Sequence, residues 1–307
     1  MKKIHLYIGA VLLGLSSCGE SNLDVVGMVA TRSESANARF EQSMEYNRQH
    51  GYATVNVPTD EYQLYVMSDT HIDFSTNNIG QFVTDYLNDP EAAPFCLHLG
   101  DLINAVNHYD TCMAHIARIW EGTGDTCFCT PGNHDIYFDQ WQVYRSYLKT
   151  GMYWFEVKTP TAKDLYICLD SSDGTLGTSQ RKWLEALLEE KYKLGYRHII
   201  AFTHTHFFKI DKSQGHTSNF ALEETYELCD LFSRYGVDLV LQGHSHSRNL
   251  TTFKGVTYLR VDALEDHYYN AFYTILGVGS EIGWRFVPVG PQDPDKFEER
   301  VPGVPHL

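Results

Sequence analysis

The segment DLVLQGHSHSRN, residues 238–249, places two histidines directly behind a short apolar run. The run Leu239–Leu241 is typical of a buried strand, and it stops at a glycine just before His244 and His246. A histidine pair in a core would need two buried hydrogen-bonding partners, and a surface pair would need no such placement. The position at a strand end therefore indicates a functional site.

Four other predicted strands end in the same way, in segments rich in Asp, Asn and His. In open α/β sheets the carboxyl ends of the strands form one rim, and ligands bind in the crevice outside it. We therefore expect these segments to converge, although they are spread over more than half of the chain. They are Ser68-Asp69-Thr70-His71, Gly100-Asp101, Pro131-Gly132-Asn133-His134-Asp135 and Thr203-His204-Thr205-His206.

The residue types in these segments predict a metal centre. Neutral imidazole and carboxylate or amide oxygen suit ions such as zinc, iron, manganese, nickel or cobalt. Seven such groups exceed the needs of one four-coordinate ion and fit two ions that share a carboxylate. Two neighbouring ions can clamp the attacking and leaving oxygens of a phosphoryl displacement, and a water bound to both supplies hydroxide near neutral pH.

The rest of the chain predicts a single α/β domain. From Glu61 onward, apolar runs of strand length alternate with helix-like segments, and beyond Gly255 three further runs read as consecutive strands. No internal repeat, low-complexity block or second linker interrupts this pattern.

Composition limits the class of protein and its partners. The chain has 307 residues, of which 43% are hydrophobic and 21% charged, as in ordinary globular proteins. Its net charge of −15 disfavours long nucleic acids and anionic membranes as broad-contact partners. A small anionic substrate held at a buried cation is still compatible with this charge.

The first residues have the pattern of an export signal. Lys2 and Lys3 precede an apolar stretch, Ile4 to Leu15, that is too short to span a bilayer as a helix. Leu15-Ser16-Ser17-Cys18 resembles a bacterial lipobox, in which the cysteine is acylated; a plain secretory signal is the alternative. We expect a lipoprotein signal peptide at 1–17, a spacer at 18–57 and the catalytic domain at 58–307. The domain would then face the periplasm or the cell exterior.

The ordered motifs Asp-x-His, Gly-Asp, Gly-Asn-His-Asp, His and Gly-His-x-His, from Asp69 to His246, resemble those of the calcineurin-like metallophosphoesterase family. The segment LDSSDGTLGTSQRKWLEALLE, residues 169–189, is similar to that of its cyclic-nucleotide phosphodiesterase and acid-phosphatase branch. This resemblance implies a single-domain, four-layer sandwich of two mixed β-sheets flanked by helices.

The resemblance also implies which residues bind two divalent or trivalent metal ions, such as manganese, iron or zinc. Asp101 would be shared, and His134 would lie near the leaving-group oxygen as an acid or electrostatic stabiliser. His204 is preferred over His206, although period-2 spacing puts both on one side of an extended chain. One ion would be held by Asp69, His71, Asp101 and His246, and the other by Asp101, Asn133, His204 and His244.

Asn104 occupies a position that distinguishes branches of the family. Phosphoprotein phosphatases carry an aspartate there that orients the histidine, and purple acid phosphatases carry an iron-binding tyrosine. Asn104 argues against both arrangements and leaves an amide for contact with a substrate oxygen.

Further candidates for substrate contact lie near the motifs. Arg248 could meet a phosphate oxygen or be simply exposed, and His108 with Tyr109 could line the pocket or begin a solvated helix. His267 follows a strand that could reach the same rim.

Together these features predict binuclear metal-dependent hydrolysis of phosphate mono- or diesters by a metal-bridging hydroxide, with a small phosphate ester as substrate. The alternative is a non-catalytic, metal-containing surface lipoprotein that acts as a binding module. A degenerate binding module would be expected to lose ligands, and this chain keeps all seven.

Overall fold

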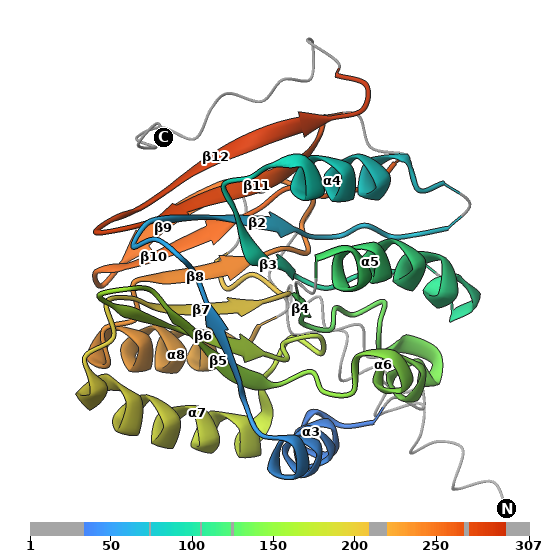
Figure 1. The fold of residues 1–307 in the computed structure, drawn as a ribbon. Coiled ribbons are helices and arrows are strands. Elements are labelled where there is room, and N and C mark those ends of the chain that lie inside the picture. The colour runs from blue at the N-terminus through green and yellow to red at the C-terminus, as the bar shows by residue number, and fades with distance from the viewer. Residues whose placement is uncertain are drawn as a thin grey trace, which may run out of the picture.

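The computed structural model describes residues 34–73, 75–104, 106–123, 126–208, 220–266 and 270–292. The strands of these segments form two mixed sheets that pack face to face, and helices cover the outer face of each sheet (Figure 1). This single helix–sheet–sheet–helix domain confirms the fold class predicted from the sequence.

The first sheet has five strands and carries three of the polar strand ends. Strands β2, β3 and β4 are parallel, so their carboxyl ends lie along one edge, whereas β11 runs antiparallel to both of its neighbours. The order across the sheet is β12 (Ile282–Val289), β11 (Ala271–Val278), β2 (Tyr62–Met67), β3 (Ala92–His98) and β4 (Thr126–Cys129). Its outer face is covered by α4 (Asn77–Asn88), α5 (Tyr109–Thr123) and α6 (Trp141–Leu148), with the short 3-10 turns η2 (Val106–His108) and η3 (Tyr137–Asp139) in the connections.

The second sheet has seven strands and carries the other two polar strand ends. Strands β6, β7, β8 and β10 are parallel to one another, and β5 and β9 pair antiparallel to them. The order is β1 (Ala53–Asn56), β5 (Tyr153–Lys158), β6 (Lys163–Leu169), β7 (Ile199–Thr203), β8 (Leu239–Gln242), β10 (Val256–Arg260) and β9 (Asn249–Phe253). Its outer face is covered by α7 (Gly177–Lys191), which continues into η4 (Tyr192–Leu194), and by α8 (Leu222–Arg234).

Alternating side chains explain why both faces of each sheet are buried. In β2, Leu64 and Val66 enter the core between the sheets, whereas Tyr65 and Met67 pack under the helices. A strand buried on both faces reads as a continuous apolar run, which is how the sequence revealed it. Phe128 of one sheet stacks on Phe155 of the other with ring centroids 3.8 Å apart.

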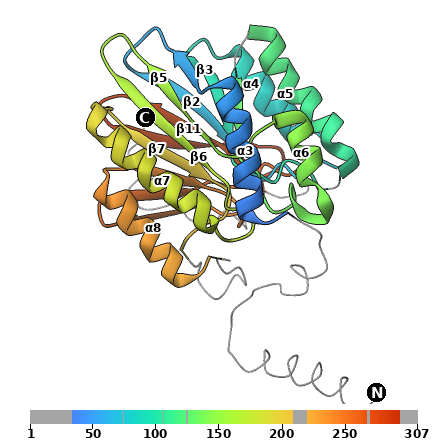
Figure 2. The same ribbon diagram turned by 90° about the horizontal axis from the view of Figure 1, so that it is seen from below.

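The expected spacer at 18–57 differs from the structure from residue 34 onward. Helix α3 (Ala36–His50) lies between α6 and α7 (Figure 2), and β1 adds an edge strand to the seven-stranded sheet beside β5. Phe40 and Met44, the only helix-spaced apolar pair in this polar segment, are buried against Met152. The folded domain therefore begins before residue 58. The polar composition of this segment did not indicate its burial, because α3 buries polar side chains as well as apolar ones.

The predicted signal peptide and Cys18 lie outside the described residues. Within the part of the chain that the structure describes, no helix combines the length and apolarity needed to cross a membrane.

Candidate metal centre

Five loops, each following a parallel strand, bring the predicted ligands to one place between the two sheets. Strands β2, β3 and β4 come from the five-stranded sheet, and β7 and β8 from the seven-stranded sheet. The predicted rim is therefore made by two packed sheets whose parallel strands end on the same side. The residues brought together are Asp69, His71, Asp101, Asn133, His134, His204, His244 and His246.

One half of the cluster consists of Asp69, His71 and His246. The Nε2 atom of His246 lies 3.3 Å from Oδ1 of Asp69 and 3.0 Å from Nε2 of His71. The three potential ligand atoms lie within 4.8 Å of one another. This spacing allows all three to contact a single ion.

The other half consists of Asp101, Asn133, His204 and His244. The Nε2 atom of His204 is 3.3 Å from Oδ2 of Asp101, 3.2 Å from Oδ1 of Asn133 and 3.2 Å from Nδ1 of His244. The other ring nitrogen of His204, Nδ1, donates to the carbonyl oxygen of Leu99 at 2.8 Å. That hydrogen bond fixes the ring so that Nε2 faces the cluster.

Asp101 connects the two halves. Its Oδ2 lies 3.5 Å from Nε2 of His71 and 3.3 Å from Nε2 of His204. The backbone N–H of His134 donates to its other oxygen, Oδ1, at 2.8 Å, which orients the carboxylate. Asp101 therefore lies between the two sets of predicted ligands, and its sharing by two ions stays a prediction.

The donor set fits metal ions. Imidazole nitrogens of His71 and His246, and of His204 and His244, face each other at hydrogen-bond distance beside buried carboxylates. The Oδ1 atom of Asp69 is buried without a hydrogen-bond donor. Lone pairs that converge in a buried space favour a cation between them, either a proton or a metal ion, because such groups are costly to bury without a compensating partner.

The pKa shifts of these groups in the metal-free chain show that the carboxylates favour positive charge at His204 but not at His244. Burial would raise the pKa of Asp69, but the nearby His204 and His246 hold it well below its ordinary value. Burial would likewise lower the pKa of His204, but Asp101 and Asp69 raise it to about 9. Burial lowers the pKa of His244 to about 4, with His204 adding to the effect. A proton on His204 thus occupies the position that a metal would take, and metal binding must release it.

Five of the seven predicted ligands sit on strained backbone. Non-glycine residues with positive φ are uncommon, and five of the nine in the described chain belong to this cluster. Such strain persists where surrounding structure holds it and gathers at functional sites. The five residues are Asp69 (φ 50°), His71 (41°), Asp101 (54°), His244 (76°) and His246 (49°).

Two glycines allow the loops to approach so closely. A Cβ atom on Gly243 would overlap Oγ of Ser68 and stand 2.7 Å from Oδ2 of Asp69. A Cβ atom on Gly132 would overlap the backbone nitrogen and Oδ1 of Asp101. Both glycines belong to the motifs for a steric reason that sequence alone does not display.

Several supporting residues were not identified from the sequence. Ser68 donates to Oδ2 of Asp69, and the backbone N–H of His244 donates to the same oxygen at 3.0 Å. Asp135 accepts hydrogen bonds from the backbone N–H of Gly132 at 2.8 Å and from the hydroxyl of Tyr109 at 3.0 Å. Burial, together with the charge of Asp101, raises the pKa of Asp135 to about 7. Its place in the Gly-Asn-His-Asp motif was the available signal.

His134 lies beside the cluster and is half-buried, with its ring centroid 4.6 Å from that of His71 in an edge-to-face arrangement. Its nitrogen can also group with His71 and Asp101. His206 is buried, and its ring packs 5.6 Å from that of His244. The structure brings His204, and not His206, into contact with Asp101.

The remaining candidates are placed as follows. Asn104 has an exposed side chain, and His108 Nδ1 lies 3.1 Å from the carbonyl oxygen of Ile72. Tyr109 is buried against Asp135, so it does not line an open pocket. His267 lies outside the described residues.

Arg248 is not simply exposed, and its guanidinium group contacts side chains other than the predicted metal ligands. Its Nε lies 3.3 Å from Oδ2 of Asp262, and its guanidinium carbon lies 3.9 Å from the ring centroid of Phe272. Arg248 therefore has partners within the protein, and its contact with phosphate stays a prediction.

A sequence model described as calcineurin-like phosphoesterase matches residues 62–248, which span the whole cluster. No curated protein matches the chain in sequence.

Solved structures share the fold at low identity. A dimetal phosphatase from Danio rerio is 11% identical with a TM-score of 0.56, and the match covers 73% of this chain and 95% of that one. A purple acid phosphatase from yellow lupin (Lupinus luteus) seeds is 13% identical with a TM-score of 0.56, covering 76% of this chain and 54% of that one, so this chain spans about half of the lupin protein. GAP50, the anchor in the inner membrane complex of Plasmodium, is 11% identical with a TM-score of 0.50, covering 75% and 85%.

Proposed function

The chain belongs to the calcineurin-like phosphoesterase family of phosphate-ester hydrolases, and we propose that it hydrolyses small phosphate mono- or diesters with two metal ions bound. The observation that carries the proposal is the position of Asp101. Its carboxylate lies between His71 of one ligand set and His204 of the other. A single-ion site would need neither the second set nor a carboxylate between them.

Each ligand set would hold one ion. Two bound ions supply a hydroxide nucleophile near neutral pH and offset the charge that grows on the phosphoryl oxygens. Asp69, His71 and His246 would hold the first, and Asn133, His204 and His244 the second, with Asp101 shared. Leu99, Ser68 and the backbone N–H groups of His134 and His244 would keep these ligands in place.

Two side chains next to the ligands would act on the substrate. His134 reaches solvent beside His71, where its imidazole can donate a proton to the leaving-group oxygen. Asn104 is exposed, and its amide can donate a hydrogen bond to a substrate oxygen.

We also propose that the protein is exported and anchored through acyl chains on Cys18, with the catalytic domain facing the periplasm or the cell exterior. The support is the lipobox-like Leu15-Ser16-Ser17-Cys18 behind a basic, apolar start. Cys18→Ser should move the protein from the membrane fraction to the soluble fraction and abolish labelling with a radioactive fatty acid. A wild-type protein that takes up no fatty-acid label would contradict the anchor.

The competing function is that of a metal-containing binding module. The similarity of fold to GAP50, named as an anchor, is the observation in its favour. The complete ligand set counts against it. Two bound ions without hydrolysis of any ester in a broad panel would establish the binding module instead.

The central experiment combines metal reloading with substitution of the shared carboxylate. The chelated protein would be reloaded with manganese, zinc, iron, cobalt or nickel and assayed against aryl phosphate mono- and diesters. Asp101→Asn should lower kcat/KM by more than about 100-fold, since even residues that only orient a ligand account for 10–100-fold. Its metal content should fall below two ions per chain.

The matched control is a buried histidine at the other end of the domain. His244→Ala should abolish hydrolysis, whereas His198→Ala removes a ring that contacts the carbonyl oxygen of Gly279 and should leave kcat/KM almost unchanged. Activity that survives Asp101→Asn with unchanged metal content would show that the shared-carboxylate arrangement is wrong.

A further inference from the structure

Arg39 of helix α3 is a completely buried charge that the proposed catalysis does not use. Its Nε donates to Oδ2 of Asp170 at 2.7 Å, and its Nη1 lies 2.9 Å from Oδ2 of Asp173. Its Nη2 donates to Oγ of Ser172 at 3.3 Å. All three partners belong to the turn that follows β6, so α3 is fastened to one short segment of the seven-stranded sheet.

That turn also holds the loop that carries His204. Ser171 lies between Asp170 and Ser172, two of the three residues that Arg39 contacts. Its Oγ accepts hydrogen bonds from the backbone N–H of Thr205 at 2.8 Å and from Oγ1 of Thr203 at 2.6 Å. Its carbonyl oxygen accepts from Oγ1 of Thr205 at 2.8 Å. Residues on both sides of His204 are thus hydrogen-bonded to the turn that Arg39 fixes.

Helix α3 makes a second connection, to the loop that carries Asn133. The indole N–H of Trp141 donates to Oε1 of Gln42 at 2.8 Å, and the guanidinium of Arg39 lies 5.8 Å from the Trp141 ring centroid. Trp141 is the first residue of α6, which closes the loop from Asn133 through η3. Figure 2 shows α3 crossing between α6 and α7.

We propose that α3 is a clasp for one half of the metal centre and that Arg39 is a positioning residue for His204 and Asn133. Both contacted loops carry ligands of the same proposed ion, whereas Asp69, His71 and His246 lie on loops for which the described residues show no hydrogen bond or ion pair to α3. Loss of the clasp should therefore weaken the second ion selectively. The inference rests on the proposed binuclear function. It means that a helix at the start of the described domain positions two of the proposed metal ligands.

An ion pair between the partly buried Arg197 and the buried Asp164, at the other end of the same strand, separates this role from general stability. Arg197 donates to both carboxylate oxygens of Asp164, from Nε at 3.0 Å and from Nη2 at 2.5 Å, and Asp164 is fully buried. Asp164 lies near the start of β6, whereas Asp170 lies just past its end. Loss of either pair leaves a buried aspartate without its arginine, so both should destabilise the fold. Only the pair at Asp170 is connected to a ligand loop.

The experiment compares Arg39→Lys with Arg197→Lys in the full chain. Both lysines keep the charge but lose the planar, multidentate contact. Metal would be removed and returned as cobalt(II), with each equivalent followed by titration calorimetry and by its visible absorption. The second equivalent is defined as the one that His204→Ala removes, because His204 belongs only to the second ligand set. Arg39→Lys should weaken the second equivalent by about tenfold or more and alter its absorption spectrum, with the first equivalent unchanged, in line with losses from residues that orient ligands. It should lower kcat more than it changes KM, and Arg197→Lys should leave both metal equivalents as in the wild type.

A second variant avoids disturbance of a buried charge. Gln42→Leu breaks the contacts of this side chain with Trp141, Arg145 and Glu34. It should weaken the second equivalent by a smaller factor, also without effect on the first. This variant decides the question if Arg39→Lys does not fold.

Three outcomes would overturn the clasp. The first is that both Arg39→Lys and Gln42→Leu bind the second metal equivalent as tightly as the wild type. The second is that Arg197→Lys weakens binding of the second equivalent as much as Arg39→Lys does. In either case wild-type hydrolysis with two ions would leave the proposed function intact. The third is a wild-type chain that binds fewer than two ions or hydrolyses no ester, which would overturn both the clasp and the proposed function.

Discussion

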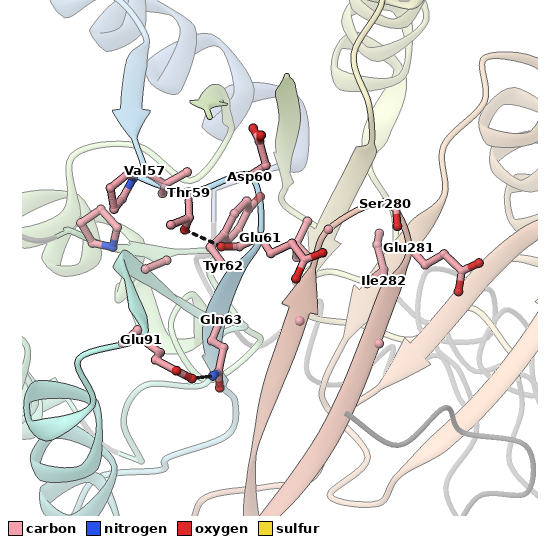
Figure 3. A pocket seen from close by; sticks show the side chains of 18 of the residues that line it. Val57, Thr59, Asp60, Glu61, Tyr62, Gln63, Glu91, Ser280, Glu281 and Ile282 are labelled. Carbon is pink, nitrogen blue, oxygen red and sulfur yellow. Dashed lines mark hydrogen bonds between the residues drawn. The ribbon is translucent and has the colours of Figure 1, made fainter. Parts of the chain in front are cut away.

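The two ends of the β-sandwich differ in what their polar residues do. At the end where β2 and β3 begin, a cavity of about 1140 Å³ opens between these strands and the β11–β12 turn. Figure 3 shows the acidic side chains Asp60, Glu61, Glu91 and Glu281 spread around its walls. At the end where β2 and β3 finish, carboxylates and imidazoles converge instead on one buried place.

This difference shows that cavity volume does not identify the functional end. The carboxylates of Glu61, Glu91 and Glu281 in the wide cavity are exposed, so water already solvates their charge. Those of Asp69 and Asp101 are buried among histidines on strained backbone, so water does not solvate their charge and a neighbouring cation must compensate for it. Convergence and burial of polar groups, and not available space, distinguish the metal centre.

The largest difference between the two ends should appear when a methyl group is added to a glycine. Gly243→Ala would drive Cβ into Ser68 and Asp69, so we expect a loss of about 1–3 kcal/mol in the free energy of unfolding and a drop of more than about 100-fold in kcat/KM. Neither value depends on a special φ angle, since Gly243 does not have positive φ. Urea unfolding and steady-state kinetics would measure the two effects.

The control for Gly243 is Gly279 at the cavity end. There the added Cβ would lie 3.0 Å from Cγ of Glu61, an exposed side chain that can move. Gly279→Ala should therefore change unfolding by less than about 1 kcal/mol and leave hydrolysis intact. Equal losses of activity from both substitutions would remove the proposed distinction between the ends.

An intermediate effect concerns two buried histidines whose pKa values shift in opposite directions. Burial lowers the pKa of His98, at the metal end, to about 3. Burial also acts to lower the pKa of His198, at the cavity end, but hydrogen bonds with Asp238 and the carbonyl oxygen of Gly279 outweigh it and raise the pKa. His98 thus stays neutral in the fold, and His198 favours its charged form.

The two histidines should consequently give stability opposite dependences on pH. Below pH 6.5 His98 is protonated in the unfolded chain but not in the folded chain. Its contribution to the free energy of unfolding is therefore present above pH 6.5 and is lost toward pH 3, by at most about 1.4 kcal/mol per pH unit. The contribution of His198 is full below pH 6.5 and is lost as pH rises through its folded pKa. His98→Asn should therefore cost more at pH 8 than at pH 5.5, and His198→Asn should cost more at pH 5.5, as measured by urea unfolding. Parallel pH profiles for the two variants would contradict these assignments.

The smallest effect should follow removal of charge from the cavity. The combined change Glu61→Gln, Glu91→Gln and Glu281→Gln should keep kcat/KM within about twofold and the metal content unchanged, because exposed surface substitutions cost little. Asp69→Asn, the same chemical change in a buried ligand, is the comparison. A tenfold loss of activity from the cavity variant would mean that the cavity end also takes part in function.

Strand and helix positions were predictable where the apolar pattern was continuous. The runs at β2, β3, β7 and β8 are buried on both faces, and the sequence showed each of them. Strand β9, helix α6 and the packing of α3 were not predicted, because half-exposed or polar segments carry little periodic signal. Arg39 in particular looks like a solvated residue until its partners 131 and 133 positions away are known.

The sequence by itself determined the fold class, the family and the set of residues that the structure brings together, because parallel strands must end on the same side wherever their apolar runs stop. Tertiary structure alone decided that two sheets share this rim, that Asp101 stands between the two ligand sets, and that Gly132 and Gly243 must lack a Cβ. It also decided that Arg248 pairs with Asp262 and that Arg39 reaches the turn beside His204. These are distances between residues far apart in the chain, and only packing in three dimensions sets them.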